Sequence, residues 1–327
     1  IGITRGILLG LESESALASL VGHEMGHVNA RHTAQQMSKG MLSSLLIAGA
    51  SAYIGSATGY ADLASNLGQI ASGALLASYS RDNERQADAL GLEYMMKAGY
   101  NPQGQVELME LLRSLHKRQP SALELMFATH PMSEERYNTV ASSIASMPPS
   151  ARELPMGRER YMDSTASLRS KKQRAAIEEL QKGEKELGAQ KFADAGRHFR
   201  QALGHVDGDY TGLLLMAKAQ YGLEDFAEMD RFAAGARKAY PAEAQAWHIG
   251  GMAKLLRKQY DEGYDLFKRS GELLPGNPNI VFFMGLCQEK MQRIKAAAAH
   301  YDDFLKKGGG GDYARYAQNR LREWGYR

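Results

Sequence analysis

Several features that would indicate a function at once are scarce in this sequence of 327 residues. Cys287 is the only cysteine, so a disulfide framework is excluded. Its apolar helical surroundings predict a core residue rather than a reactive thiol. The formal net charge of +3 is small for this length, which argues against a nucleic-acid binder and against a polybasic membrane anchor. The length is sufficient for two domains, each with its own core.

A pair of histidines stands in the segment VGHEMGHVNARH, residues 21–32. A helix turns about 100° per residue, so His23 and His27 lie within roughly 40° of each other and can offer two imidazoles to one metal ion. Glu24 points to the side of this pair, where a zinc hydrolase needs a general base beside the metal-bound water. The alternative is a helix with solvated or hydrogen-bonded histidines, because HExxH arises by chance in about one of a hundred such chains.

A catalytic zinc ion needs a third protein ligand, with the fourth position left to water. The continuous pattern HExxHxxGxxH does not supply this ligand, because Ala30 and Thr33 stand where glycine and histidine are required. On a continuous helix, His32 would lie about 180° from His23, and we therefore interpret it as a surface histidine.

A later segment, residues 78–102, offers a carboxylate as the third ligand. Glu84 and Asp88 are four residues apart on one helical face, so one can bind the metal while the other hydrogen-bonds the far nitrogen of a ligating histidine. Asp82 faces away from both. A solvated charged face is the alternative, since neighbouring arginines can pair with these carboxylates. The upstream HExxH favours the metal site.

Three segments together resemble a known family. HEMGH is followed by SRDNERQAD at residues 80–88 and by ATHP at residues 128–131. This order is similar to that of the zinc metallopeptidases that include the CaaX prenyl proteases, HtpX and the periplasmic BepA-type protease-chaperones. The resemblance covers residues 1 to about 145 and implies a gluzincin-type zinc peptidase domain. It implies the following site: zinc ligands His23, His27 and Glu84, general base Glu24, and Asp88 as hydrogen-bond partner of a ligand.

The resemblance also gives an expectation for the first residues. The opening IGITRGILLG, residues 1–10, would be the end of a substrate-side strand that leads into the active-site helix. The chain opens with Ile1 rather than Met and lacks the segments that precede this one in the family. We therefore interpret it as a fragment or a processed product.

His130 precedes a proline in the segment FATHPMSEERY. Pro131 favours an extended residue before it and can open a helix after it, so we expect His130 on a loop just before a helix. A histidine that only caps local structure is one interpretation. The resemblance implies a position near the metal instead. There His130 could stabilise the oxyanion formed on a peptide carbonyl, or occupy the open position of the metal and plug the site.

Long runs of Leu, Ile or Val are also missing. Residues 41–61 carry no charge and are long enough to span a bilayer. However, Ser, Gly, Thr and Ala make up much of this stretch, which argues against spanning. A second uncharged run, residues 63–80, follows Asp62. We predict a helical hairpin over the catalytic cleft, with membrane contact at most peripheral. No signal peptide is visible, although a processed chain would have lost it.

The second half of the sequence contains repeats. Apolar periodicity is lost at residues 147–170, where Pro, Ser and Arg accumulate, and we predict a linker there between a peptidase domain at 1–146 and a repeat domain at 171–327. Three sets of residues recur 34 positions apart: Gly183, Ala217, Gly251 and Gly285; Phe192, Phe226, Tyr260 and Ile294; and Ala202, Ala236, Ser270 and Phe304. This spacing is typical of tetratricopeptide repeats, which form an α-solenoid of paired helices. Residues 312–327 would form a capping helix.

The sequence therefore predicts a mainly α-helical zinc endopeptidase joined to a solenoid that binds a protein partner or presents substrate. By resemblance, the setting is the bacterial periplasm, the substrates are unfolded or misassembled proteins, and a candidate partner is the outer-membrane assembly machinery. The alternative is a chaperone or scaffold whose zinc site is latent or structural. The repeats also contain His198, His205, His248 and His300. These lack shared acidic partners, so we interpret them as packing or surface residues.

Overall fold

The computed structural model describes residues 2–33, 79–118, 130 and 133–326. The regular secondary structure of this part of the chain is α-helical, which confirms the predicted fold class. The chain divides into two compact units, Ile1–Arg174 and Ala175–Arg327. The predicted hairpin of residues 41–61 and 63–80 lies outside the described residues, apart from its last two positions. Among the residues with a described placement, no helix is both long and apolar enough to cross a membrane.

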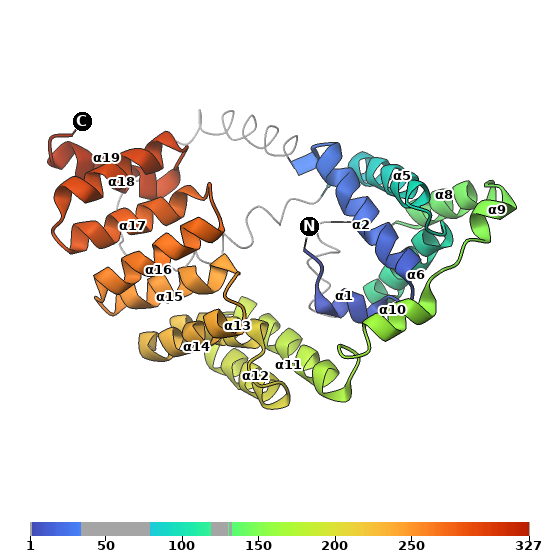
Figure 1. Cartoon of the computed structure of the whole chain (residues 1–327), viewed down its shortest axis with the longest axis horizontal. Coiled ribbons are helices and arrows are strands. Elements are labelled where there is room, and N and C mark those ends of the chain that lie inside the picture. The colour runs from blue at the N-terminus through green and yellow to red at the C-terminus, as the bar shows by residue number, and fades with distance from the viewer. Residues whose placement is uncertain (1, 34–78, 119–129, 131–132, 327) are drawn as a thin grey trace. The chain divides into compact units, whose positions relative to one another are not determined.

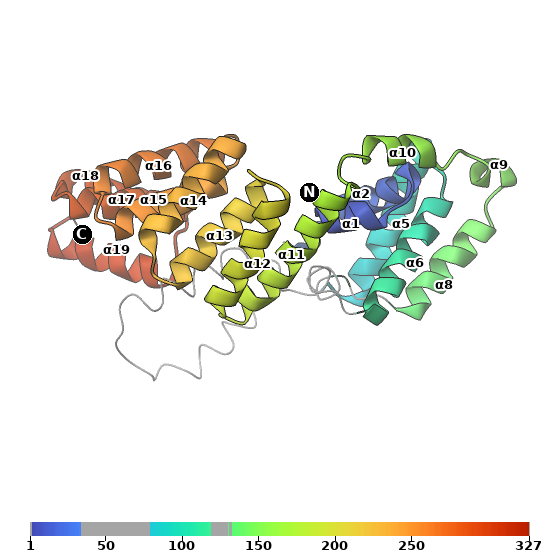
Figure 2. The same cartoon turned by 90° about the horizontal axis from the view of Figure 1, so that it is seen from below.

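The first unit is a group of helices around α2. Its helices are α1 (Arg5–Gly10), α2 (Glu14–Asn29), α5 (Arg81–Lys97), α6 (Gln103–Arg118), α8 (Glu134–Ala145), α9 (Pro149–Arg152) and α10 (Arg158–Ser164). α2 packs against both α5 and α6, and α6 also packs against α8 (Figures 1 and 2). Serine side chains cap the starts of α2 and α5, where Ser13 accepts from the backbone N–H of Ala16 and Ser80 from that of Asn83.

Small residues let α2 and α5 approach closely. A Cβ atom on Gly22 would lie 2.9 Å from the carbonyl oxygen of Gly91, and one on Gly26 would lie 3.0 Å from the Cα of Ala87. Each of these two α2 glycines directly precedes a histidine of the HExxH motif. The backbone contact therefore sets the face of α2 that carries the histidines against the face of α5 that carries the acidic residues.

The first residues form a helix, so the strand expected for residues 1–10 is wrong. Thr4 caps α1, because its side chain accepts from the backbone N–H of Ile7. Ile7 and Leu11 are one helical turn apart, and both are buried in a core cluster with Leu20. This spacing of apolar residues suits a helix that covers one end of α2.

Residues 147–170 pack onto the first unit instead of forming an extended linker. The Tyr161 ring on α10 is 2% exposed, and its hydroxyl donates to the carbonyl of Leu8 at 2.7 Å. The guanidinium of Arg169 donates to the carbonyls of Leu9 at 3.0 Å and Leu11 at 2.6 Å. The side chain of Asn101 also donates to the backbone carbonyls of Arg152 and Leu154, so much of this packing uses polar groups that the composition of a linker would also contain.

The second unit consists of helix pairs. The pairs are α11 (Lys171–Gly188) with α12 (Phe192–His205), α13 (Tyr210–Gly222) with α14 (Phe226–Ala239), α15 (Ala244–Leu256) with α16 (Tyr260–Leu273), and α17 (Pro278–Lys290) with α18 (Ile294–Lys306). Neighbouring helices along the chain pack side by side from α12 to α19, as Figure 1 shows. The second helix of each pair begins at one of the large residues that recur with the 34-residue spacing, and the predicted solenoid is confirmed.

The backbone repeats with the same spacing. Within each pair, the turn contains a non-glycine residue in the left-handed region: Gln190, Glu224, Lys258 and Gln292, with φ of 59° to 63°. The glycines at the helix contacts leave room for aromatic rings, since a Cβ atom on Gly183 would lie 2.3 Å from the ring of Phe199. Cys287 is fully buried as predicted, and burial raises the pKa of its thiol to about 12.

The last helix, α19 (Gly311–Glu323), packs against α17 and α18 in the place of the predicted cap. Glu289 of α17 is 5% exposed and accepts from the hydroxyls of Tyr301 at 2.6 Å and Tyr316 at 2.9 Å. Arg320 of α19 lies 2.8 Å from the same carboxylate. Two of these three partners belong to α19, so this buried polar cluster anchors the cap to the last repeat.

His248 makes the stability of the repeats depend on pH. Its ring lies 5.4 Å from that of Phe267 and 5.5 Å from that of Phe283, and burial lowers its pKa to about 4. An unfolded histidine has a pKa of about 6.5, so between these values the unfolded chain binds a proton that the folded chain does not. Stability therefore falls as the pH decreases through this window.

We expect His248→Phe to reduce this loss, because phenylalanine keeps a ring of similar size between its neighbours without a titrating group. Thermal unfolding of the second unit, measured at about pH 7 and about pH 4.5, should show a larger decrease in midpoint for the native chain than for the variant. An equal decrease in both proteins would show that other groups cause the acid sensitivity.

Candidate metal centre

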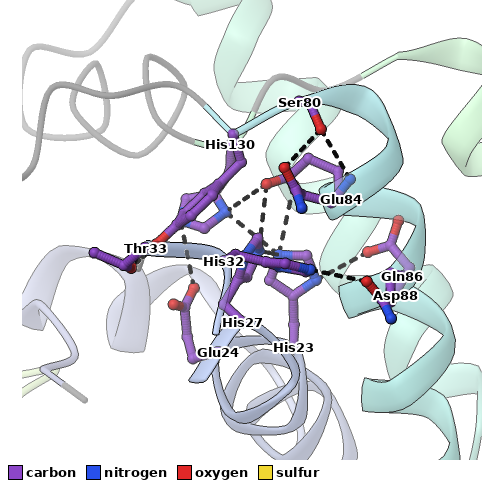
Figure 3. Close-up of polar contacts among 12 residues, drawn as sticks. His23, Glu24, His27, His32, Thr33, Ser80, Glu84, Gln86, Asp88 and His130 are labelled. Carbon is purple, nitrogen blue, oxygen red and sulfur yellow. Dashed lines mark hydrogen bonds and ion pairs between the residues drawn. The ribbon is translucent and has the colours of Figure 1, made fainter. Parts of the chain in front are cut away.

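Three side chains from two helices converge at the contact of α2 and α5 (Figure 3). The Nε2 atoms of His23 and His27 lie 3.1 Å apart. Glu84 Oε1 lies 3.3 Å from His27 Nε2, and Glu84 Oε2 lies 3.5 Å from His23 Nε2. His23 is 7% exposed, His27 is 3% exposed and Glu84 is 0% exposed. The structure thus brings together the three ligands that the sequence analysis predicts.

These separations fit a single metal ion. Ligand atoms at about 2.0–2.2 Å from a tetrahedral ion lie about 3.3–3.6 Å from one another. The two histidine nitrogens are 3.1 Å apart, and each of the two Glu84 oxygens lies 3.3 or 3.5 Å from one of them, which is close to that range. Imidazole nitrogens and a carboxylate oxygen are also the donor types that first-row divalent metals such as zinc accept. The cluster can therefore hold a metal ion without a large rearrangement.

Asp88 orients one of the histidines. Its Oδ1 atom lies 2.9 Å from His23 Nδ1, so the Nδ1–H group can donate to this carboxylate while Nε2 faces the cluster. Burial alone would lower the pKa of His23, but hydrogen bonds with Asp88 and Glu84 outweigh it and raise that pKa to about 9. Against the effect of burial, hydrogen bonds with His130, His23 and His27 hold the pKa of Glu84 below its usual range. Hydrogen bonds with His23 and Arg136 do the same for the pKa of Asp88.

His130 approaches the cluster from outside α2 and α5 (Figure 3). Its Nδ1 atom lies 3.1 Å from Glu84 Oε1 and 3.3 Å from His23 Nε2, and its Nε2 atom lies 3.7 Å from Glu24 Oε1. One nitrogen or oxygen atom each of His23, His27, Glu84 and His130 lie within 4.8 Å of one another. Glu24 borders this group, and its side chain is 28% exposed.

His130 precedes a helix, as the sequence analysis expects, but the proline does not open that helix. α8 begins at Glu134, and the side chain of Ser133 caps it by accepting from the backbone N–H of Arg136. The start of α8 is therefore stabilised by a serine at the N-cap and not by a proline at the first helical position.

His32 is buried, so its interpretation as a surface histidine is wrong. The residue is 0% exposed, its Nδ1 atom lies 2.9 Å from His27 Nδ1, and its Nε2 atom lies 3.0 Å from Gln86 Oε1. The reason is local. α2 ends at Asn29, and Arg31 adopts a left-handed conformation with φ of 56°, so His32 does not follow the direction of a continuous helix.

Arg136 also belongs to the site, although the sequence does not predict it. This residue of α8 is 3% exposed, and its guanidinium donates to both carboxylate oxygens of Asp88 at 2.7 Å. A further nitrogen of the same group lies 2.7 Å from Glu84 Oε2. Arg136 thus holds both acidic residues of the cluster through one planar group. An arginine six positions after His130 carries no spacing signal of its own, since the contact depends on how α8 packs.

Comparisons with known proteins agree with this geometry. Residues 1–144 match the model of peptidase family M48. The metalloprotease YcaL of Escherichia coli (strain K12) is 35% identical over 141 residues, which are 42% of this chain and 53% of that protein. The beta-barrel assembly-enhancing protease of the same organism is 31% identical over 135 residues, which are 38% of this chain and 26% of that protein. The chain therefore spans about half the length of the first relative and a quarter of the second.

A solved structure is similar to the chain at a low level. TTC0263, described as a thermophilic TPR protein of Thermus thermophilus, is 13% identical with a TM-score of 0.42, and the match covers 63% of this chain and 98% of that one. The repeat fold of the second unit follows from its own helix pairs and 34-residue spacing. The histidine and glutamate cluster lies within the residues that the peptidase model matches. The match to peptidase family M48 thus covers residues 1–144, which include the candidate metal centre.

Proposed function

We propose that the chain is a zinc-dependent endopeptidase that cleaves unfolded or misassembled proteins in the bacterial periplasm. The observation that carries the proposal is the convergence of His23, His27 and Glu84 at ligand distances beside a partly exposed glutamate, Glu24. Relatives named as a metalloprotease and as a beta-barrel assembly-enhancing protease support this setting and suggest quality control of outer-membrane proteins as the task.

His23, His27 and Glu84 would hold the zinc ion, which when bound would supply an acidified water molecule and a Lewis acid for the peptide carbonyl. Glu24, at the border of the cluster, would act as the general base and return the proton to the leaving amine. Asp88 and Arg136 keep the histidine ring and the carboxylates in place through the reaction.

The test is the cleavage of an unfolded, unlabelled protein by the zinc-loaded chain. Treatment with a chelator should stop the cleavage, and added zinc should restore it. Cleavage that continues after the zinc has been removed, as measured by elemental analysis, would contradict the proposal.

His130 gives a reason to consider a second function, that of a chaperone or scaffold with a latent zinc site. Its Nδ1 atom lies 3.3 Å from His23 Nε2 and 3.1 Å from Glu84 Oε1, separations similar to those among the other three ligands. A zinc ion with four protein ligands is closed to substrate. We therefore favour the role of a plug for His130 over that of an oxyanion donor.

Replacing His130 by alanine separates these roles. If His130 plugs the site, His130→Ala should cleave an unfolded protein faster than the native chain, because the fourth position is then open to water. If it stabilises the oxyanion, the variant should be slower by about a hundred- to a thousandfold. An unchanged rate would exclude both roles.

The repeat unit is proposed to bind a protein partner, such as the outer-membrane assembly machinery, or to present substrate. Repeats contact chiefly their neighbours, and Ile1–Arg174 forms a compact unit by itself. We predict that a chain ending after Arg174 folds and binds zinc but loses partner binding. Folding is measured by circular dichroism, zinc binding by the zinc content, and partner binding by co-purification with membrane proteins. A truncated chain that is insoluble or free of zinc would show that the peptidase domain needs the repeats.

A further inference from the structure

The turn that follows α2 brings a further histidine against the candidate ligand His27. α2 ends at Asn29, and the left-handed conformation of Arg31 turns the chain so that His32 lies at the contact of α2 and α5. His32 is 0% exposed there, and its Nδ1 atom lies 2.9 Å from His27 Nδ1 (Figure 3). His27 therefore presents one ring nitrogen, Nε2, to the cluster and the other to His32.

The hydrogen-bonding capacities of the groups in this contact agree from both ends. A metal ion binds the Nε2 lone pair of His27 when the ring proton is on Nδ1, and this Nδ1–H group then needs an acceptor. At the other end, His32 Nε2 lies 3.0 Å from Gln86 Oε1, an oxygen that can only accept. His32 thus carries its proton on Nε2, and its Nδ1 lone pair is free to accept from His27.

The same turn also secures one face of the His27 ring. The ring of Tyr79 covers this face, with the two ring centres 4.0 Å apart and the planes inclined by 31°. The hydroxyl of Tyr79 lies 2.9 Å from the Oγ1 atom of Thr33, the residue directly after His32. The edge and the face of the His27 ring are therefore both held by contacts that depend on the turn after α2.

The partners of the two histidine ligands differ in charge. Asp88 accepts from His23 as a carboxylate, and the guanidinium of Arg136 balances its charge at 2.7 Å. A carboxylate in the place of His32 would add a further negative charge to the buried Glu84 and Asp88, and a buried charge without a partner is costly. An imidazole provides the acceptor without that charge.

We propose that His32 is a positioning residue, which holds the His27 ring in the orientation and the tautomer that bind zinc. The inference rests on the metal centre of the proposed function and adds a residue to it. Without this acceptor, the buried Nδ1–H group of His27 would lose its partner, and the other tautomer, whose Nε2–H group cannot bind a metal, would become more populated. Loss of such a partner typically weakens metal binding by about ten- to a hundredfold.

Two substitutions separate positioning from packing. In His32→Asn, the side-chain oxygen can take the place of Nδ1 and accept from His27, whereas His32→Leu fills the space without an acceptor. We expect the zinc dissociation constant of His32→Asn to lie within about threefold of the native value, and that of His32→Leu to be about ten- to a hundredfold higher. Competition with a chromophoric chelator measures these constants. His205→Leu, at the exposed end of α12, is the control for the loss of a histidine and should keep the native affinity.

A second measurement uses the native chain and needs no stable variant with leucine. Heteronuclear NMR spectra of the nitrogen-labelled, zinc-loaded chain report which ring nitrogen of each histidine carries the proton. The signals of His32 are those that are absent from the spectrum of His32→Asn. We expect its proton on Nε2. A proton on Nδ1 would overturn the inference, because two N–H groups would then face each other.

The outcomes separate this inference from the proposed function. Equal zinc affinities in the native chain and both variants would overturn the positioning role, and an equal loss in His32→Asn and His32→Leu would assign His32 to packing only. A chain that shows the expected order of affinities but cleaves no unfolded protein would contradict the peptidase function and support the role of His32. A native chain that binds no zinc would overturn both.

Discussion

Replacing Glu24 by glutamine should abolish peptide hydrolysis and leave zinc binding intact. The amide cannot accept a proton from the water molecule, and the loss of a general base typically slows a reaction by about a hundred- to ten-thousandfold. Glu24 borders the cluster without being one of its four closely spaced residues, so the ligands are unchanged. The measurements are the initial rate on an unfolded protein and the zinc content of the same sample.

A matched variant controls for the loss of a negative charge. Glu93 lies on the exposed surface of α5, where it pairs with Lys97 at 2.5 Å. Glu93→Gln should keep both activity and zinc content, since an exposed ion pair contributes little. Cleavage by Glu24→Gln at a rate similar to that of Glu93→Gln would show that another group is the base.

Replacing Arg136 by methionine should strongly destabilise the metal-free first unit. The substitution leaves Asp88 and Glu84, which are 5% and 0% exposed, without their shared cation. Removing one partner of a buried ion pair costs about 3–5 kcal/mol, because the remaining charge stays buried. The zinc affinity should also decrease, by about ten- to a hundredfold, since the carboxylate that orients His23 loses its support.

Arg85 is the control for this variant. It lies on α5 and pairs with Asp82 and Glu135 at the surface, where its side chain is 43% exposed. Arg85→Met should cost less than about 1 kcal/mol. Urea unfolding of the three metal-free proteins compares the free energies. If Arg136→Met unfolds at the same urea concentration as Arg85→Met, the buried arginine does not hold the two carboxylates.

The parts of the site that sequence could predict depend on helical geometry alone. The spacing of His23 and His27, and that of Glu84 and Asp88, places each pair on one face whatever the rest of the chain does. The repeats are predictable for a similar reason, since each 34-residue unit contacts its neighbours. In both cases the information lies in a short stretch of sequence.

The features that sequence did not predict depend on single backbone angles or on packing between distant segments. The left-handed conformation of Arg31 turns the chain and buries His32, which a continuous helix would expose. Arg136 follows Asp88 by 48 positions in the chain, and it reaches this residue only because α8 packs against the rest of the first unit. Tyr161 anchors a segment whose composition is typical of a linker. Such contacts leave no periodic signal in the sequence.

Anomalous diffraction at the zinc absorption edge, from crystals of the zinc-loaded chain, is the most direct test of the metal centre. We predict one strong peak per chain, at about 2.0–2.2 Å from His23 Nε2, from His27 Nε2 and from a carboxylate oxygen of Glu84. A zinc peak bound by other residues, or none at these three side chains, would contradict the assignment of this site as the centre of a zinc peptidase.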